Sequence, residues 1–197
     1  MWPYNDQKEH MNQEKRIYEC TLIIRSNLSE DQAKTIAREL YPIISSSNGS
    51  IVSSEYWGFK SLAYRIKKNT KAHYVCLVFE SGNIKALYDA LEFNQNVLRF
   101  LCIKRDTLPT GPSAQYVSSL DEQSDSGAQK NDGNEPASQK MNTDIEYKNI
   151  RLIKKHMTEH GKISPAHAGR VNRSQQKQIA NAIKRARFLA LLPYVVQ

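Results

Sequence analysis

The pattern that comes nearest to a catalytic motif is a pair of histidines in the C-terminal quarter of the chain. His156, Glu159 and His160 have the H-x-x-E-H spacing of a zinc peptidase. On a helix the two imidazoles would lie on one face, as two ligands of one zinc ion must. However, Gly161 is expected to end that helix, no third ligand follows in a helical context, and Lys155 would repel the cation. We therefore predict no enzymatic activity, no metal site and no cofactor.

The cysteines are the other candidates for metal or redox chemistry. Cys20, Cys76 and Cys102 are far apart in the sequence, and each lies within an apolar run. Their odd number is typical of a reduced, cytosolic protein and not of a disulfide framework. We expect them to pack on three strands as small hydrophobic side chains.

The positive charge of the chain is concentrated at its C-terminal end. Residues 144–197 contain 11 Lys and Arg against three Asp and Glu, whereas residues 106–143 contain two against six. A short segment this basic usually binds a polyanion, most often nucleic acid. An acidic membrane surface is the weaker alternative, because no amphipathic helix in the sequence carries a face rich in Trp and Phe. A membrane-spanning protein is not expected, because no apolar run approaches the roughly 20 residues that span a bilayer.

Phosphate contacts made by these cations would give steeply salt-dependent binding. The candidate RNA-binding residues are Lys162, Arg170, Arg173, Lys177, Lys184, Arg185 and Arg187, with Lys71 and Arg99 in the N-terminal half as weaker candidates. The alternative interpretation of the C-terminal group is a solvated helix face. Lysines on strand edges can instead serve to oppose aggregation.

The candidate cations lie in two segments that are expected to fold, and a segment of different composition lies between these two. Residues 106–143 are rich in Ser, Gly, Asn, Gln and Asp, which predicts a disordered linker because such a segment buries too little apolar surface. Residues 1–15 are expected to form a flexible arm. Apolar periodicity is found in residues 16–105 and 144–197, which we interpret as two domains.

The first domain is expected to have the order β-α-β-β-α-β. The expected elements are a strand over 18–25, a helix from a capping box at Ser29 to Ile44, strands over 50–59 and 62–67, the second resuming at 72–80, a helix from Asn83 to about Phe93, and a strand over 97–105. This order is typical of the ferredoxin-like α+β fold, in which a four-stranded antiparallel sheet carries two helices on one face. Its other face is then available to solvent or to a partner.

The second domain, residues 144–197, is expected to be small, basic and all-α. A short helix should end at Gly161, and a longer helix should run from Ser174 to Leu192 and be ended by Pro193. A domain of about 54 residues without a disulfide or metal is marginally stable alone. We therefore expect it to dock on the open sheet face of the first domain.

Specific residues in both domains resemble known families. The N-terminal match consists of Tyr18-Glu19, Trp57-Gly58, Leu62-Ala63-Tyr64, Ile66, Lys71-Ala72-His73-Tyr74-Val75, Phe93-Asn94 and Arg99. Through these, residues 16–106 resemble bacterial small-subunit ribosomal protein six. The C-terminal match consists of Ile145, Tyr147-Lys148, Gly161-Lys162-Ile163, Pro165, Gln176, Gln178, the run Ala182-Ile183-Lys184-Arg185-Ala186-Arg187, and Leu191-Leu192-Pro193-Tyr194. Through these, residues 144–196 resemble small-subunit ribosomal protein eighteen.

This double resemblance implies a structural protein of the small ribosomal subunit. Members of the two families bind 16S-type ribosomal RNA together in the platform, and the implied partners are that RNA and neighbouring ribosomal proteins. Joined in one chain, the two domains would form the equivalent of a heterodimer in a bacterial-type cytoplasmic ribosome. An RNA-binding translational regulator that acts off the ribosome is the alternative.

Overall fold

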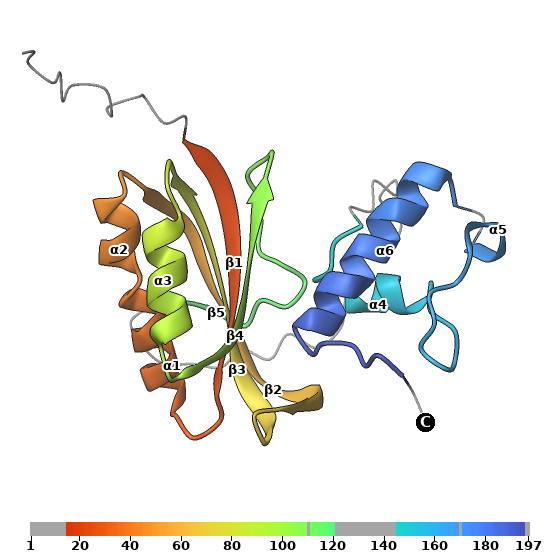
Figure 1. Ribbon diagram of the computed structural model, residues 1–197, viewed down its shortest axis with the longest axis horizontal. Helices are drawn as coiled ribbons and strands as arrows, with labels where there is room; N and C mark the ends of the chain where they lie inside the picture. The colour runs from red at the N-terminus through yellow and green to blue at the C-terminus, as the bar shows by residue number, and fades with distance from the viewer. Residues whose placement is uncertain (1–14, 110, 121–144, 170, 196–197) are drawn as a thin grey trace, which may run out of the picture.

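The computed structural model (Figure 1) describes residues 15–109, 111–120, 145–169 and 171–195. Almost all of the expected N-terminal arm lies outside the described residues, as do residues 121–143 of the expected linker. Among the residues that are described, no helix is both long and apolar enough to cross a bilayer.

A single antiparallel sheet forms the centre of the molecule. Its strands are β1 (Arg16–Arg25), β2 (Ser50–Ile66), β3 (Asn69–Ser81), β4 (Val97–Arg105) and β5 (Ser118–Ser119), in the spatial order β4-β1-β3-β2-β5. The helices are α1 (Glu30–Arg38), α2 (Tyr41–Ser46), α3 (Lys85–Phe93), α4 (Ile150–Lys154), α5 (Ala166–Gly169) and α6 (Arg173–Phe188). The ferredoxin-like fold and the helical C-terminal region are confirmed, with β5 as an additional edge strand.

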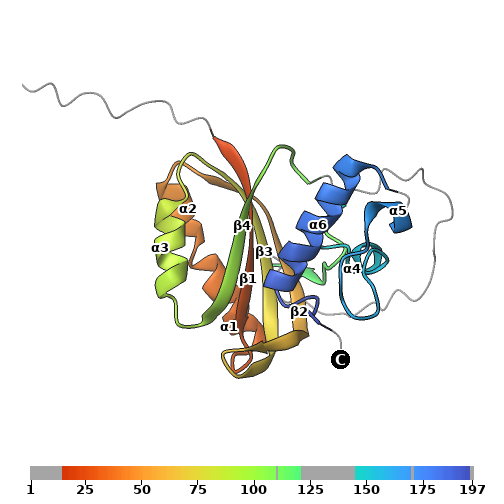
Figure 2. The same cartoon turned by 45° about the vertical axis from the view of Figure 1, so that its right-hand side comes forward.

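Helices cover the two faces of the sheet separately. Helices α1, α2 and α3 lie on one side, and α4 and α6 lie on the other (Figures 1 and 2). Alternation along β1 sends Cys20, Leu22 and Ile24 into the core beneath the first group of helices, whereas Ile23 joins a second core that includes Ile183 of α6. The sheet is thus buried on both faces by different parts of the chain.

The first helical segment is divided by a proline. The capping box at Ser29 is confirmed, since its hydroxyl accepts from the Gln32 backbone N–H while the Gln32 side chain accepts from the Ser29 N–H. The expected continuous helix to Ile44 is wrong. Helix α1 ends at Arg38, and α2 starts anew at Tyr41 with Pro42 in its first turn. Proline has no N–H for the helical ladder, and it is tolerated in a first turn where none is needed.

Strand β2 is continuous over 17 residues, so the two separate strands expected before residue 67 are wrong. Register shifts within the β2–β3 ladder absorb the irregularity of this long strand. The hairpin closes at the pair Ile66–Asn69, and Lys67 and Lys68 between them have φ of 45° and 68°. Two consecutive left-handed residues are typical of a type I′ turn. The turn places two lysines at the tip of the hairpin.

Residues 111–120 form a strap along the edge of β2. The Val117 N–H donates to the Tyr56 carbonyl (3.0 Å), and the Leu120 side chain is fully buried in the core beneath α1. The buried Glu55 carboxylate accepts from the Ser113 N–H (3.0 Å). The linker expected to begin at residue 106 therefore does not begin there. The first part of this segment contains Leu120, which completes the core beneath α1. The average composition of the segment is polar and does not reveal this residue's role.

We predict that Leu120→Ala lowers the free energy of unfolding by about 2 kcal/mol, the low end of the range for Leu→Ala in a core. The cost is limited because β5 pairs with β2 through two residues and can detach locally. Urea unfolding of the full chain measures the effect. Leu108→Ala, at a side chain that is 47% exposed, is the control. Equal midpoints for the two variants would mean that Leu120 does not anchor the strap.

The expectation of three unpaired cysteines is wrong for two of them. Cys20 and Cys102 face each other across β1 and β4 and form a disulfide with a Cα–Cα distance of 4.0 Å. Cys76 on β3 is free and buried, and burial raises the pKa of its thiol. The pairing follows from the placement of β4 beside β1, which the spacing of cysteines in the sequence does not specify.

Candidate nucleic-acid interface

Helix α6 separates its apolar residues from its cations. Asn172 and Gln175 form a capping box at its start. The buried face consists of Ile179, Ala182, Ile183 and Ala186, and the exposed face carries Arg173, Lys177, Lys184 and Arg185. These four cations lie within about 120° around the axis of an ideal helix and therefore on one side of it, which we call the α6 basic face.

The C-terminal end of α6 lies against the sheet. The helix ends at Phe188 and not at the expected Leu192, because Ala190 takes up a left-handed conformation with φ of 51°. The last carbonyls of a helix have no partner within it. Here the Tyr74 hydroxyl donates to the Leu189 carbonyl (2.7 Å), and the Ala63 N–H donates to the Ala190 carbonyl (2.8 Å).

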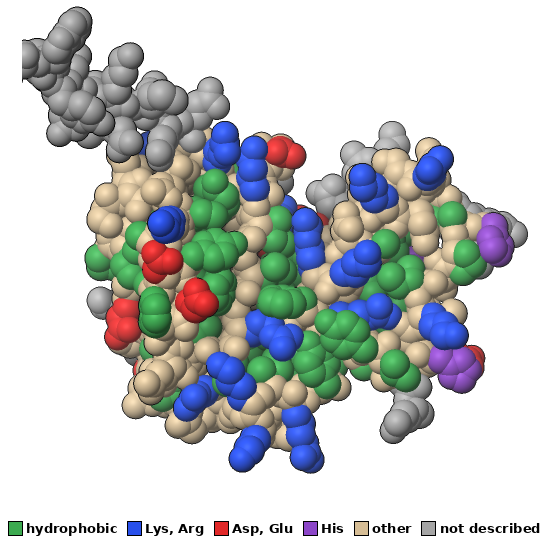
Figure 3. Space-filling model, viewed as in Figure 1, with side chains coloured by type: hydrophobic (Ala, Val, Ile, Leu, Met, Phe, Trp, Pro, Cys, Tyr) green, Lys and Arg blue, Asp and Glu red, His purple; other side chains and the backbone are tan. Residues whose placement is uncertain are grey.

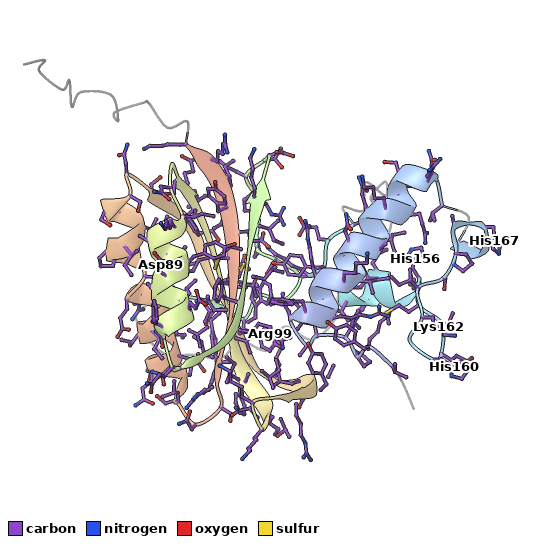
Figure 4. All side chains as sticks on the ribbon, viewed as in Figure 1. Asp89, Arg99, His156, His160, Lys162 and His167 are labelled. Atoms are coloured by element: carbon purple, nitrogen blue, oxygen red, sulfur yellow. A yellow bond between two sulfur atoms is a disulfide. The ribbon has the colours of Figure 1, made fainter. Side chains whose placement is uncertain are left out.

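Arg99, a candidate for RNA contact, is engaged at this helix end. Its Nη1 donates to the Tyr64 hydroxyl (2.6 Å) and to the Phe188 carbonyl (2.5 Å), and the guanidinium carbon lies 4.8 Å from the centre of the Phe188 ring. Figure 4 shows Arg99 on the sheet beside the end of α6. A cation at this position also interacts favourably with the helix dipole. Arg99 thus has a positioning role between β4 and α6.

Arg187 is also half-buried and directed toward protein. Its guanidinium donates to the Gly161 carbonyl and lies 5.7 Å from the centre of the Tyr194 ring. It thereby holds the turn that carries Lys162, whose own side chain is exposed. The half-buried Arg187 is in this respect unlike the cations of the α6 basic face.

A buried ionic cluster joins the segment before α4 to the sheet. Glu19 on β1 is fully buried, and its Oε2 lies 2.9 Å from Lys148 Nζ and 2.7 Å from Arg105 Nε. The Tyr147 hydroxyl donates to the Glu19 carboxylate and lies 2.8 Å from the Thr21 hydroxyl. The expected candidate residues did not include this cluster. The signal was available, since Glu19 is the charged residue within an otherwise uncharged strand over 17–24.

The opposite charges in this cluster favour the ionised form of Lys148. Burial alone would lower the pKa of Lys148, but the neighbouring Glu19 carboxylate contributes to a net shift above the usual value. Burial raises the pKa of Tyr147 well above its usual value, so Tyr147 stays a neutral donor. The stabilisation from the lysine is therefore fully present below the usual lysine pKa and is lost only as the pH rises through the raised value.

Comparisons with known proteins match the two parts of the chain to two families. Residues 17–104 match the model of Ribosomal protein S6, and residues 141–192 match that of Ribosomal protein S18. Small ribosomal subunit protein bS6 of Paramagnetospirillum magneticum is 41% identical over 104 residues, which cover 52% of this chain and 72% of that protein. This chain belongs to the ribosomal protein S6 family. It carries an S18 region in the same polypeptide.

Two other bS6 proteins agree with this assignment. That of Acidiphilium cryptum is 41% identical over 100 residues (50% of this chain, 63% of that protein), and that of Rickettsia felis is 41% identical over 98 residues (49% and 81%). A crystal structure of 30S ribosomal protein S6 from Thermotoga maritima aligns with a TM-score of 0.45 and 26% identity, covering 47% of this chain and 89% of that one.

The histidine motif of the S18 region does not lie on one helix. Helix α4 ends at Lys154, and the chain then turns so that Met157 pairs with Ile163 in a β-bridge. His160 lies on the exposed loop beyond (Figure 4), so it does not share a helix face with His156. Within the described parts of the chain, no cluster of His, Cys, Asp or Glu could hold a metal ion. As a member of a structural ribosomal family, the chain is not an enzyme.

The remaining candidates differ in their surroundings. In the S18 region, Lys162 is exposed on a turn and Arg170 lies outside the described residues. In the S6 region, Lys71 is exposed on β3 with its Nζ 5.9 Å from the centre of the Phe59 ring. Figure 3 shows Lys and Arg side chains over α6 and around the β2–β3 end of the sheet, with the acidic side chains of this view lying mostly over the α3 side.

Proposed function

We propose that the chain binds small-subunit ribosomal RNA as the covalently joined equivalent of an S6–S18 pair and stabilises the platform during assembly and translation. The observation that carries this proposal is a basic helix whose apolar face packs on the S6 sheet while its cations remain exposed. Such an arrangement presents a rigid cationic surface to the phosphate backbone. The coarser conclusion, a protein of the small ribosomal subunit, follows from the two families.

Intramolecular docking of residues 144–197 on residues 16–105 is the first part of this proposal. It is supported by a common apolar core in which Trp57 and Tyr74 of the sheet lie with Ile183 and Leu189. The buried cluster around Glu19 adds polar contacts to this core. A tether within one chain supplies an effective concentration of about millimolar, which removes much of the entropic cost of association.

The RNA-contact surface is the second part. We assign phosphate contacts to the α6 basic face and to Lys162, whose side chains are exposed and lie on the S18 region. Lys71 remains a candidate at the sheet. Arg99 and Arg187 act by positioning α6 and the turn around Gly161. We further propose that neighbouring small-subunit proteins are partners and that the ribosome concerned is bacterial in type and cytoplasmic.

Intact-protein mass spectrometry of purified small subunits tests this function. A stoichiometric species near 22.6 kDa is expected if the joined chain is the ribosomal component. Two smaller species would retain the ribosomal function but contradict the covalent pair. Absence of this chain from the subunit, together with tight binding to a short free RNA, would instead support a regulator that acts off the ribosome.

A further inference from the structure

A groove lies beside the edge strand β4. It has a volume of about 470 Å³ and is lined by one face of α3, by residues 97–102 of β4, and by Phe188 at the end of α6. Strand β4 is the last strand on its side of the sheet. The groove therefore lies where the S6 region and the S18 region meet, next to the α6 basic face.

Three aromatic rings belong to the lining of the groove. Tyr88 and Phe100 meet edge to face with 5.3 Å between ring centres. Tyr88 is 36% exposed and Phe188 is 39% exposed, so both rings retain surface that a ligand can contact. The Phe188 ring is held in place from the protein side by the Arg99 guanidinium, itself fixed by two hydrogen bonds. A fixed aromatic ring with free surface is suited to stacking on a planar ligand.

The charge at the groove favours an anionic ligand. Lys67, from the tip of the β2–β3 hairpin, is part of its lining together with Arg99. Lys184 precedes Phe188 by four residues on α6, which places both side chains on the same helix face. Glu92 is the acidic residue of the lining, on the α3 side. A polyanion that follows the α6 basic face would thus reach the aromatic rings from their cationic side.

We propose that this groove receives one unpaired nucleobase of the bound RNA, stacked on Phe188, while Lys184 and Lys67 contact the flanking phosphates. This inference rests on the proposed function, since it assigns a base-binding site within the same RNA surface. Unpaired bases stacked on aromatic side chains are the common mode of single-strand RNA recognition. Arg99 is a positioning residue in this site, because it holds the ring that makes the contact.

Equilibrium binding of the full chain to a central-domain fragment of small-subunit ribosomal RNA tests the site, with the Phe188→Ala variant. Loss of one stacked base is expected to weaken binding about 5- to 150-fold. The slope of log K against log salt should stay unchanged, because stacking releases no counterions. Phe93→Ala is the matched control, since Phe93 is 83% exposed and lies at the end of α3 outside the groove lining.

A second measurement applies if Phe188→Ala alters folding. Photo-crosslinking of the unmodified chain to the same RNA with 5-bromouridine substitutions should label Phe188 or Tyr88. Wild-type affinity of Phe188→Ala, or crosslinks confined to other residues, would overturn the nucleobase site while leaving the proposed function intact. If the unmodified chain does not bind this RNA at all, the proposed function fails as well.

Discussion

Replacing Glu19 with glutamine is expected to lower the free energy of unfolding by about 3–5 kcal/mol. The substitution keeps the shape of the side chain but leaves Lys148 Nζ, which is buried, without the carboxylate 2.9 Å away. It also removes the carboxylate oxygen that lies 2.7 Å from Arg105 Nε, so that Arg105 keeps only its contact with Glu146 among the residues that the structure describes. A buried charge without its partner costs far more than a lost neutral hydrogen bond. Urea unfolding of the full chain, followed by far-UV circular dichroism, measures the loss.

The matched control for this variant is Glu30→Gln. Glu30 is half-exposed and pairs with Lys34 at 2.9 Å in an i,i+4 arrangement on α1. A pair of this kind contributes about 0.3–0.5 kcal/mol. If Glu19→Gln were no more destabilising than Glu30→Gln, the buried cluster would not hold the segment before α4 on the sheet.

A double variant tests whether the buried ion pair itself stabilises the folded chain. In Glu19→Gln/Lys148→Met neither the buried carboxylate nor the buried ammonium remains, so we expect the double variant to be more stable than Glu19→Gln alone. Buried ion pairs can often be replaced by apolar residues without loss of stability. Recovery would mean that the ion pair contributes little net stability compared with apolar side chains at the same positions. Additive losses from the two substitutions would exclude that interpretation.

Local patterns predicted the elements whose causes are local. The capping box at Ser29 and the apolar stripe of α6 depend on residues a few positions apart, and both are present in the structure. The expected long first helix is wrong because Pro42 has no N–H to donate to the Arg38 carbonyl, and apolar periodicity does not register this break. The strap that contains Leu120 was missed because a few apolar residues within a polar segment decide its placement.

The candidate site was predictable in composition but not in detail. Exposed cations on α6 follow from helical periodicity, as Lys177 and Lys184 illustrate. The inward positions of Arg99 and Arg187 do not, because their partners are backbone carbonyls at Phe188 and Gly161. Such acceptors are exposed by helix ends and turns that only the tertiary structure defines. The pairing of Cys20 with Cys102 could not be predicted either, because it depends on β4 lying beside β1 in the sheet.

The triple variant Lys177→Gln/Lys184→Gln/Arg185→Gln is expected to weaken binding to the ribosomal RNA fragment and to reduce its salt slope by about 3, one for each lost phosphate contact. The three side chains are exposed, so unfolding should change by only about 0.5 kcal/mol per site at most. Filter binding between about 50 and 200 mM salt, over which several phosphate contacts change affinity by orders of magnitude, measures the slope.

The matched control removes the same charge elsewhere. Lys15, Arg16 and Lys85 are exposed at the start of β1 and of α3, away from α6. If RNA recognises the α6 basic face, the corresponding triple glutamine variant should keep nearly the full slope, although its net charge is equal. Equal losses in both variants would mean that binding responds to net charge alone. Arg99→Gln gives the complementary result, because this residue supports the end of α6. Its replacement should lower the free energy of unfolding and leave the slope of log K against log salt nearly unchanged.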